Sequence, residues 1–438
     1  MAKKIGIGLL GLGTVGTGVA NIIQSPSGRH PLVADIELVR IAVRNLNRTR
    51  CVSIAESLLT QDPKEVVDDN SVDVVVEVIG GIEPARSLIL RAIAAGKSVV
   101  TANKAVIARH GEEIAAAANE SGVYVLIEAA VGGGIPIIEP LKQSLGGNKI
   151  SKVSGIINGT TNYILSKIAK EGVSYREVLK QAQELGYAES DPAADVEGFD
   201  SADKIAILSS LAFGGSINRE SIPTKGISNL NSLDVAYANK LGYEIKLLAV
   251  AERLETKNKA INSLPLGLWV QPTLIPKEHP LAGVNGVNNA ILVEGDPIGE
   301  VMFYGPGAGA GPTASAVVAD ILNIAGVGAL GDNQKSLDPL LQANSWRNCH
   351  LVEPSKIIQK HYLRLKTEDS PGVIGQIGNV FGHNDVSIQS IVQFDSTQAG
   401  AEIVVITHHV PQGQIEASLK TIRNLEAVKG ISAQMVCI

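Results

Sequence analysis

The first strand, turn and helix decide the fold of this chain: residues 3–24 read KKIGIGLLGLGTVGTGVANIIQ. Lys3–Leu10 predicts a buried apolar strand, and Thr17–Gln24 predicts a helix. The G-x-G-x-x-G run between them lets the chain turn tightly, lets a pyrophosphate approach the backbone and lets the helix pack on the strand. The motif therefore predicts a dinucleotide site at the helix N-terminus. Its candidate residues are Gly11, Gly13, Thr14, Val15 and Gly16.

Strands and helices alternate after this unit. The apolar segments Ile36–Val43, Asp73–Ile79, Lys97–Thr101 and Val123–Ile127 predict strands, and Glu83–Ala95 and Ala105–Asn119 predict helices. This alternation predicts a doubly wound parallel sheet, the Rossmann arrangement. Ligands of such sheets lie beyond the carboxyl ends of the strands, which places Thr101 and Lys104 near the cofactor. Because a cation is disfavoured at the start of a helix, Lys104 is interpreted as functional.

The end of the second strand bears on the choice of cofactor. An NAD site places an acidic residue there for the ribose 2′-hydroxyl. This chain has Arg44 instead, followed by Arg48 and Arg50. A guanidinium suits a 2′-phosphate, so the sequence favours NADP, with NAD possible; solvated loop charges are the alternative.

A glycine-rich turn leaves the last strand of this part, from Glu128 to Pro136. Such a turn exposes backbone carbonyls, and with the Glu128 carboxylate they offer oxygen ligands to a hard monovalent cation. A hinge between domains has the same spacing, so both interpretations stay open.

The next part is helical first and strand-rich later, which predicts an α+β domain. It contains the acidic stretch LGYAESDPAADVEGFDSADK, Leu185–Lys204. Asp200 and Lys204 are four residues apart at a helix start, so both share one face, where a carboxylate can orient an ammonium group. A solvated acidic loop is the simpler alternative.

The chain ends in a third unit after a second glycine-rich loop. We expect the loop 305–312 and its following helix to return to the first domain, with Gly307 at the cofactor. Residues 331–356 predict a linker. The remainder predicts a ferredoxin-like βαββαβ order.

Composition narrows the classes of function. The 438 residues suit about two to three domains, with 45% hydrophobic residues. A net charge of −6 disfavours nucleic-acid binding, and no segment is typical of a membrane span. Three dispersed cysteines suggest a reducing compartment, so we expect a cytoplasmic protein.

Together these motifs resemble homoserine dehydrogenases with a C-terminal ACT regulatory domain, over nearly the whole chain. The resemblance rests on Gly11–Gly16, Thr101–Lys104, Glu128–Pro136, Asn158–Asn162 and, most specifically, Leu185–Lys204. It implies reversible NAD(P)H-dependent reduction of L-aspartate 4-semialdehyde to L-homoserine, in threonine, methionine and isoleucine biosynthesis. It also implies a homodimer or homotetramer that threonine inhibits through the ACT domain.

The resemblance implies roles for particular residues. Lys204 would donate the proton with Asp200 beside it, and Lys104 would lie at the nicotinamide and the reacting oxygen. Glu189 and Asp195 would bind substrate. The metal ligands, for Na⁺ or K⁺, would be Glu128, Val131, Gly133 and Ile135; the effector residues would be Asp369, Gly372 and Asn384.

The implied domains are 1–130 with 305–330 for the cofactor, 131–304 for catalysis and dimerisation, 331–356 as linker and 357–438 as ACT domain. A phosphorylating semialdehyde dehydrogenase is the first alternative, but it needs a nucleophilic cysteine, and Cys51, Cys349 and Cys437 are badly placed. A non-catalytic NADP-binding regulator is the second, and the intact Lys104 and Lys204 argue against it.

Overall fold

The structure, a computed structural model, describes residues 4–255, 263–329, 337–397 and 400–438. The chain forms two compact units, each assembled from three segments. Unit 1 comprises Met1–Val153, Asp203–Glu220 and Asn288–Cys349; unit 2 comprises Ser154–Ala202, Ser221–Val287 and His350–Ile438. The ferredoxin-like tail thus belongs to the same compact unit as parts of the predicted catalytic domain. The domain boundaries given above stay predictions.

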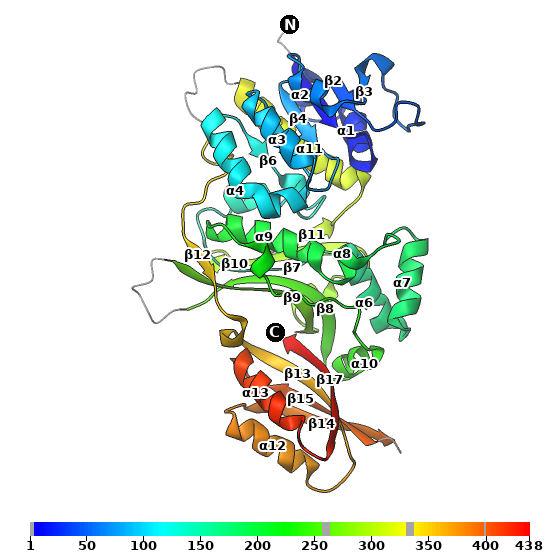
Figure 1. The fold of residues 1–438 in the computed structure, drawn as a ribbon, viewed down its shortest axis with the longest axis vertical. Coiled ribbons are helices and arrows are strands. Elements are labelled where there is room, and N and C mark those ends of the chain that lie inside the picture. The colour runs from blue at the N-terminus through cyan, green and yellow to red at the C-terminus, as the bar shows by residue number, and fades with distance from the viewer. Residues whose placement is uncertain (1–3, 256–262, 330–336, 398–399) are drawn as a thin grey trace. The chain divides into compact units, whose positions relative to one another are not determined.

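Unit 1 contains a six-stranded parallel sheet with the order β3-β2-β1-β4-β5-β6 (Figure 1). Its strands are β1 (Ile5–Leu10), β2 (Ile36–Ala42), β3 (Leu59–Thr60), β4 (Val74–Glu77), β5 (Ser98–Thr101) and β6 (Val125–Leu126). The chain winds outward in both directions from β1 and β4, so a crevice opens at the carboxyl ends of these two strands. The predicted doubly wound sheet is confirmed.

Two apolar cores cover the two faces of this sheet. Successive residues of β1 enter opposite cores, since Leu9 packs in one cluster and Leu10 in the other. The first core takes Val19 of α1 and Val317 of α11; the second takes residues of α2, α3 and α4. These helices are α1 (Thr14–Gln24), α2 (Pro63–Asp68), α3 (Ala85–Ala94), α4 (Lys104–Ser121) and α11 (Ala310–Ala329).

Helix α11 returns to the cofactor sheet from late in the sequence, as expected, and packs along α1 (yellow beside dark blue in Figure 1). By length and composition alone, Ala310–Gly328 passes as a membrane span. However, Ala314, Val317 and Ile321 are buried in the sheet core. That is the position of a core helix in a globular domain.

The rest of unit 1 includes a hairpin and several short helices. Strands β10 (Asn288–Asp296) and β11 (Gly299–Pro306) form an antiparallel hairpin that leads into α11. Short helices η3 (Glu128–Ala130) and α5 (Ile138–Lys142) enclose the first glycine-rich turn. The other short helices are η1 (Pro31–Asp35), η2 (Glu56–Leu58) and η4 (Arg219–Ser221).

Unit 2 begins with helices and continues with two long strands. Helix α6 (Gly159–Glu171) is followed by α7 (Tyr175–Glu184), which a Ser174–Glu177 capping box begins. Strands β8 (Tyr243–Arg253) and β9 (Leu264–Pro276) form an antiparallel pair in which Val250 faces Trp269. The other elements are α8 (Ala193–Val196), α10 (Ser232–Lys240) and η5 (Pro280–Gly283); β7 (Lys149–Ile156) and α9 (Phe199–Phe213) have residues in both units.

The predicted ferredoxin-like βαββαβ order of the tail is confirmed. Its strands follow the order β17-β13-β15-β14, and buried residues such as Phe381 and Leu419 hold α12 and α13 on the sheet. Its elements are β13 (Ile358–Thr367), α12 (Val373–His383), β14 (Ile388–Thr397), β15 (Gly400–Thr407), β16 (Val410–Pro411), α13 (Gln412–Ile422) and β17 (Val428–Cys437). Strand β17 also pairs in parallel with β9, joining the tail to the rest of unit 2.

Helix α10 was not predicted, because its apolar residues lack a helical period. It packs on α6 and β8, and it contacts the tail through a buried ion pair. Asp234 accepts hydrogen bonds from Arg364 Nε at 2.7 Å and from the Tyr362 hydroxyl at 3.0 Å. Tyr237 also stacks on Phe394, with ring centroids 4.0 Å apart. The tail is therefore anchored on α10 by both polar and aromatic contacts.

The predicted linker is bound to unit 1 over much of its described length. Residues 331–336 lie outside the described residues. Beyond them, the N–H of Asp338 donates to the Tyr124 hydroxyl at 2.8 Å, and Leu341 is buried in the sheet core. Strand β12 (Cys349–Leu351) and η6 (Pro354–Lys356) complete the segment. Residues 337–349 thus form a strap on unit 1, whereas the N–H of Val352 donates to the Leu266 carbonyl within unit 2.

Candidate active site

A cavity of about 560 Å³ lies at the carboxyl end of β1, lined by Gly11, Gly13, Arg44 and Gly80 among others. The three fingerprint glycines serve it differently. Gly11 has a φ of 105°, and a Cβ on Gly16 would lie 2.1 Å from the Gly11 carbonyl oxygen. A Cβ on Gly13 would meet nothing within 4 Å, which leaves the start of α1 open to a ligand. The fingerprint thus has the geometry that a dinucleotide phosphate needs.

Three arginines line the same cavity at the end of β2. Arg50 donates to the backbone carbonyls of Asn45, Leu46 and Arg48, so it holds the loop in shape. Within the part of the chain that the structure describes, no acceptor is bonded to the guanidinium of Arg44 or Arg48. These two cations are therefore available to an anionic group in the cavity.

Lys104 and Lys204 line a second cavity, of about 260 Å³. Its walls come from the fingerprint helix, the first glycine-rich turn and the second glycine-rich loop. The lining residues include Val15, Gly80, Asn103, Ala129, Ala130, Gly132, Gly133, Gly307, Ala308 and Thr313. The structure thus brings together two lysines that are 100 positions apart in sequence.

Lys104 is positioned by a buried network at the end of β4 and β5. Thr101 donates to the Glu77 carboxylate at 2.6 Å and accepts the Asn103 N–H at 3.0 Å. Asn103 caps α4 and donates to the Gly81 carbonyl at 2.7 Å. Thr101 is fully buried and does not line either cavity, so it supports the site indirectly. Glu77 was not singled out from the sequence, although an acidic residue inside an apolar strand indicates a buried polar contact.

Lys204 is positioned by the residue before it. The Asp203 carboxylate accepts from Arg219 Nε at 2.6 Å and from Arg109 at 3.1 Å. Arg109 lies on α4, which begins at Lys104. This ion pair fixes α9 against α4 and so holds the two lysines in one cavity. Arg109 and Arg219 were not singled out from the sequence either, since their partner Asp203 is distant from both in sequence.

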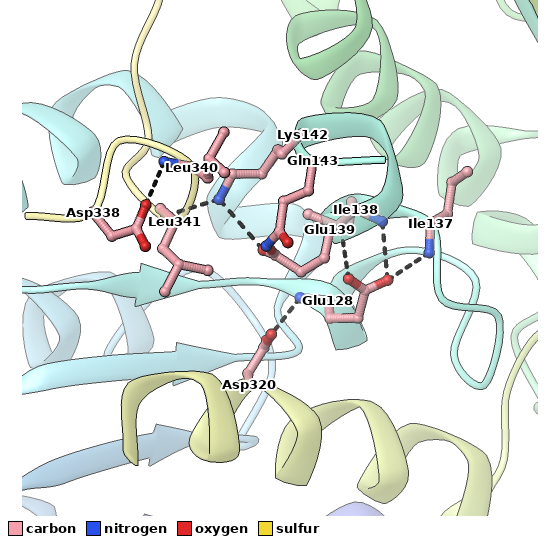
Figure 2. Close-up of polar contacts among 10 residues, drawn as sticks. All are labelled: Glu128, Ile137, Ile138, Glu139, Lys142, Gln143, Asp320, Asp338, Leu340 and Leu341. Atoms are coloured by element: carbon pink, nitrogen blue, oxygen red, sulfur yellow. Dashed lines mark hydrogen bonds and ion pairs between the residues drawn. The ribbon is translucent and has the colours of Figure 1, made fainter. Parts of the chain in front are cut away.

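The first glycine-rich turn is anchored by buried carboxylates (Figure 2). Glu128 accepts the backbone N–H groups of Ile137, Ile138 and Glu139 at 2.6, 2.9 and 2.8 Å. Asp320 of α11 accepts the Glu128 N–H at 2.8 Å. Burial raises the pKa of Glu128, and burial together with the Glu128 charge raises the pKa of Asp320 well above its usual range. One carboxylate therefore closes the turn, and the other ties it to α11.

Lys142 joins this cluster to the strap. The carboxylates of Glu128, Glu139 and Asp320 lie within 4.8 Å of one another. The Lys142 ammonium lies 3.4 Å from Glu139 and donates to the Leu341 carbonyl at 2.8 Å (Figure 2). A cation thus lies beside the cluster and also binds the segment that leads to the tail.

In unit 2, the acidic stretch is ordered around Asn158, the cap of α6. The Asn158 amide donates to Asp195 at 2.7 Å and to Asp200 at 3.0 Å. Thr160 donates to the second Asp195 oxygen at 3.1 Å. Glu189 is exposed, and its carboxylate has no bonded partner among the described residues. Asp195 and Asp200 are therefore brought together, while Glu189 is not joined to them.

Comparisons with known proteins now place this site in a family. Family profiles match residues 11–128 as "Homoserine dehydrogenase, NAD binding domain" and 136–322 as "Homoserine dehydrogenase". The homoserine dehydrogenase of Synechocystis is 55% identical over 425 residues, which is 97% of each chain. The chain belongs to the homoserine dehydrogenases. As a homoserine dehydrogenase it is an oxidoreductase with an NAD(P)-binding domain.

Solved structures of homoserine dehydrogenases share the fold. The crystal structure from Thiobacillus denitrificans has a TM-score of 0.89 and 42% identity, and covers 100% of this chain and 98% of that chain. A hyperthermophilic archaeal homoserine dehydrogenase in complex with NADPH has a TM-score of 0.60 and 27% identity, and covers 74% of this chain and 98% of that chain. The cysteine-dependent alternative is correspondingly disfavoured, since none of the described residues that line the two cavities is a cysteine.

The tail of this homoserine dehydrogenase matches the ACT domain profile over residues 361–427. Gly372, with a φ of 90°, is the N-cap residue that precedes α12. The Asp369 carboxylate in the preceding turn accepts from Gln393 at 3.1 Å. The Asn384 amide donates to the Val380 carbonyl at 2.9 Å, at the opposite end of α12 from Gly372. The candidate effector residues are thus partly occupied by contacts within the domain.

Proposed function

We propose that this homoserine dehydrogenase catalyses the reversible NADP(H)-dependent interconversion of L-aspartate 4-semialdehyde and L-homoserine. The observation that carries the proposal is the pair of lysines, Lys104 and Lys204, in one cavity at the end of the cofactor sheet. Hydride addition to an aldehyde leaves negative charge on oxygen, and two fixed ammonium groups stabilise that charge.

In the proposed reduction the cofactor supplies the hydride, and residues of the chain supply the proton and stabilise the charge. Bound dihydronicotinamide supplies a hydride to the carbonyl carbon. As that C–H bond forms and the C=O π bond breaks, Lys204 Nζ gives one proton to the oxygen, and Lys104 stabilises the oxygen by charge. Asp200, one helical turn before Lys204 on α9, would keep that lysine charged and oriented. The reverse reaction needs neutral Lys204 as base.

Carboxylates of the acidic stretch suit the amino-acid end of the substrate. The substrate ammonium needs an anionic partner, and Glu189 offers an exposed carboxylate with no bonded partner in the part of the chain that the structure describes. Asp195 is already oriented by Asn158 and Thr160, so it offers a fixed acceptor. We assign substrate binding to Glu189 and Asp195 on this chemistry.

The function is tested by NADPH oxidation with purified full-length protein and L-aspartate 4-semialdehyde. Turnover that requires both reactants, with homoserine as product, supports it. NADPH binding without turnover would instead favour the non-catalytic regulator considered from the sequence.

For the cofactor, we propose NADP, bound through Arg44 and Arg48 at the 2′-phosphate. The uncommitted guanidinium groups in the first cavity support this choice, as does the NADPH complex of the archaeal relative.

Replacing Arg44 with alanine should raise the KM for NADPH by about tenfold and leave the KM for NADH within about twofold. The tenfold figure corresponds to one charge-assisted hydrogen bond of roughly 1.5 kcal/mol. Arg50→Ala is a useful comparison, because loss of its loop contacts should weaken both cofactors alike. Equal changes for NADPH and NADH in Arg44→Ala would reject the phosphate assignment.

A monovalent cation, Na⁺ or K⁺, fits part of the proposed ligand set. Among the described residues, no donor is bonded to the carbonyls of Val131, Gly133 or Ile135, which leaves three hard oxygen ligands in one turn. The Glu128 carboxylate differs, because backbone N–H groups already engage both its oxygens. We therefore propose that the carbonyls hold the cation and that Glu128 shapes the turn around them.

We propose that threonine inhibits the enzyme through the ACT domain. Two contacts link the Asp369 turn to α10 through β14: Gln393 donates to Asp369, and its neighbour Phe394 stacks on Tyr237. Helix α10 packs on α6, whose cap Asn158 orders Asp195 and Asp200. An effector at this turn therefore has a continuous line of contacts to the substrate carboxylates within unit 2.

The sharper test of regulation uses point variants, because deleting the tail would remove Tyr362 and Arg364 from Asp234 and Phe394 from Tyr237, and so would uncover α10. We expect threonine to inhibit the wild type, and Asp369→Ala to raise the inhibitory concentration by about tenfold, within the usual range of allosteric coupling. Glu416→Ala on the exposed face of α13 is the control. A wild-type enzyme that millimolar threonine leaves unaffected would remove threonine as effector.

The oligomer and the compartment are further proposals. We propose a homodimer or homotetramer in the cytoplasm, acting in threonine, methionine and isoleucine biosynthesis, in keeping with the family. Light scattering on the purified protein tests the oligomer, and a homoserine auxotroph tests the pathway.

A further inference from the structure

The first glycine-rich turn is held as a closed ring by one side chain. Glu128 precedes residues 129–136, and its carboxylate accepts three N–H groups at the start of the segment that follows (Figure 2). These N–H groups begin a short helix and would otherwise lack partners. The side chain before the turn therefore caps the helix after it, which fixes both ends of the turn.

Asp320 anchors this ring to the rest of unit 1. Its Oδ2 accepts the Glu128 N–H at 2.8 Å, across 192 positions of sequence. Asp320 is fully buried, and its other oxygen has no hydrogen-bond partner within the described ranges. Leaving a buried N–H without an acceptor costs roughly 1–3 kcal/mol. Asp320 is thus the acceptor on which the attachment of the ring to α11 depends.

The ring, residues 128–139, forms one wall of the second cavity, which is lined by Lys104 and Lys204 and is called the lysine cavity below. Helix α11 forms part of another wall. Ala129, Ala130 and Gly133 line the cavity from the ring, and Thr313 lines it from α11. Thr313 lies seven residues, about two helical turns, before Asp320. A Cβ on Gly133 would lie 2.4 Å from the Gly307 carbonyl oxygen, so the two walls meet with no spare room. Any shift of the ring would alter the cavity that holds Lys104 and Lys204.

We propose that Asp320 is a positioning residue for the reaction: by accepting the Glu128 N–H, it fixes the 129–133 wall of the lysine cavity against α11. Asp320 does not line the cavity, so it acts through the ring and not on substrate or cofactor. The inference rests on the roles proposed for the two lysines. A misplacement of about 1 Å near reacting groups is enough to lower turnover by roughly 10²-fold.

The test compares two substitutions in the full-length enzyme. Asp320→Asn keeps a side-chain oxygen for the Glu128 N–H, and Asp320→Leu has similar size but no acceptor. We expect the leucine variant to lose roughly 10²-fold in kcat while its Kd for NADPH changes less than about threefold, since the adenosine end binds elsewhere. The asparagine variant should stay within about threefold of wild type in kcat. Hydrogen–deuterium exchange of residues 129–136 should rise in the leucine variant alone.

Glu139→Gln is the matched control, because it alters a carboxylate of the same cluster whose bonded partners, among the described residues, are Lys142 and Gln143. It should leave kcat and the hydrogen–deuterium exchange of residues 129–136 near wild type.

If the leucine variant does not fold, Asp320→Ser replaces it, since the serine hydroxyl is one bond too short to reach the Glu128 N–H. A folded variant without the acceptor that keeps normal kcat and normal exchange overturns the proposal. So does an asparagine variant as impaired as the leucine variant. If the wild type does not turn over the semialdehyde, the proposed function fails, and the exchange comparison still decides the role of Asp320.

Discussion

Replacing Lys204 with alanine is expected to lower kcat by about 10²-fold or more, the usual contribution of a positioned general acid. The physical reason is the charge that develops on the substrate oxygen when hydride arrives. Without Lys204, protonation falls to water or to Lys104, which has a role of its own. The Kd for NADPH should change by less than about twofold, because Lys204 lines the second cavity and not the first, where Arg44 lies. Steady-state rates and fluorescence titration with NADPH measure the two quantities.

Two controls separate loss of the acid from loss of structure. Lys204→Met keeps the length of the side chain and should be as slow as alanine. Lys180→Ala, which removes a lysine that is 78% exposed on α7, should change neither rate nor stability. Near-normal turnover in both Lys204 variants would assign the proton donor to another group.

The second large effect concerns the buried ion pair that joins α10 to the ACT domain. Arg364→Met should destabilise unit 2 by about 3–5 kcal/mol, the usual cost of leaving one buried charge without its partner. The side chain of Asp234 is 2% exposed, and among the described residues it would keep the Tyr362 hydroxyl as its one side-chain donor. Asp234→Ala should cost less, because Arg364 would retain Glu402 at 3.1 Å. The predicted order of the two single variants is thus a direct consequence of the second acceptor.

The double variant Asp234→Leu with Arg364→Met should be more stable than Arg364→Met alone. Two apolar side chains of similar volume remove both charges from the interior, and such replacements are often neutral or stabilising. Urea unfolding midpoints of the wild type, Arg364→Met, Asp234→Ala and the double variant give the comparison. Lys180→Ala, which removes an exposed ion pair, is the control. If the double variant is the least stable, the ion pair contributes net attraction that exceeds its desolvation cost.

The sequence predicted best the features that a short segment imposes on its own backbone. Gly11, Gly13 and Gly16 occupy positions that need a tight turn, an open approach and close packing, and the structure gives each that geometry. The alternation of apolar strands and helices was sufficient for the doubly wound sheet, because a strand buried on both faces is recognisable from composition alone. The βαββαβ order of the tail was readable from its succession of apolar strand segments and helices.

The sequence also nominated Lys104, Lys204 and Asp200, because charged residues at helix starts are locally unusual, and the family resemblance added Asp195. It did not indicate which groups orient them. Asn158 bridges Asp195 and Asp200 from a different helix, and Arg109 reaches Asp203 across 94 positions. Such partners carry no local pattern, since any polar residue at the right point in space would serve.

For Glu128 and Asp320 the contrast is sharpest. The sequence suggested a turn with oxygen ligands and named Glu128, but it attached no meaning to an aspartate within an apolar helix. Only the tertiary structure places Asp320 on the Glu128 N–H and turns the Glu128 carboxylate onto Ile137, Ile138 and Glu139. Backbone conformation and hydrophobic period are local properties that residues carry with them. The partner of a buried polar group is decided by chain segments that meet only when the fold has formed.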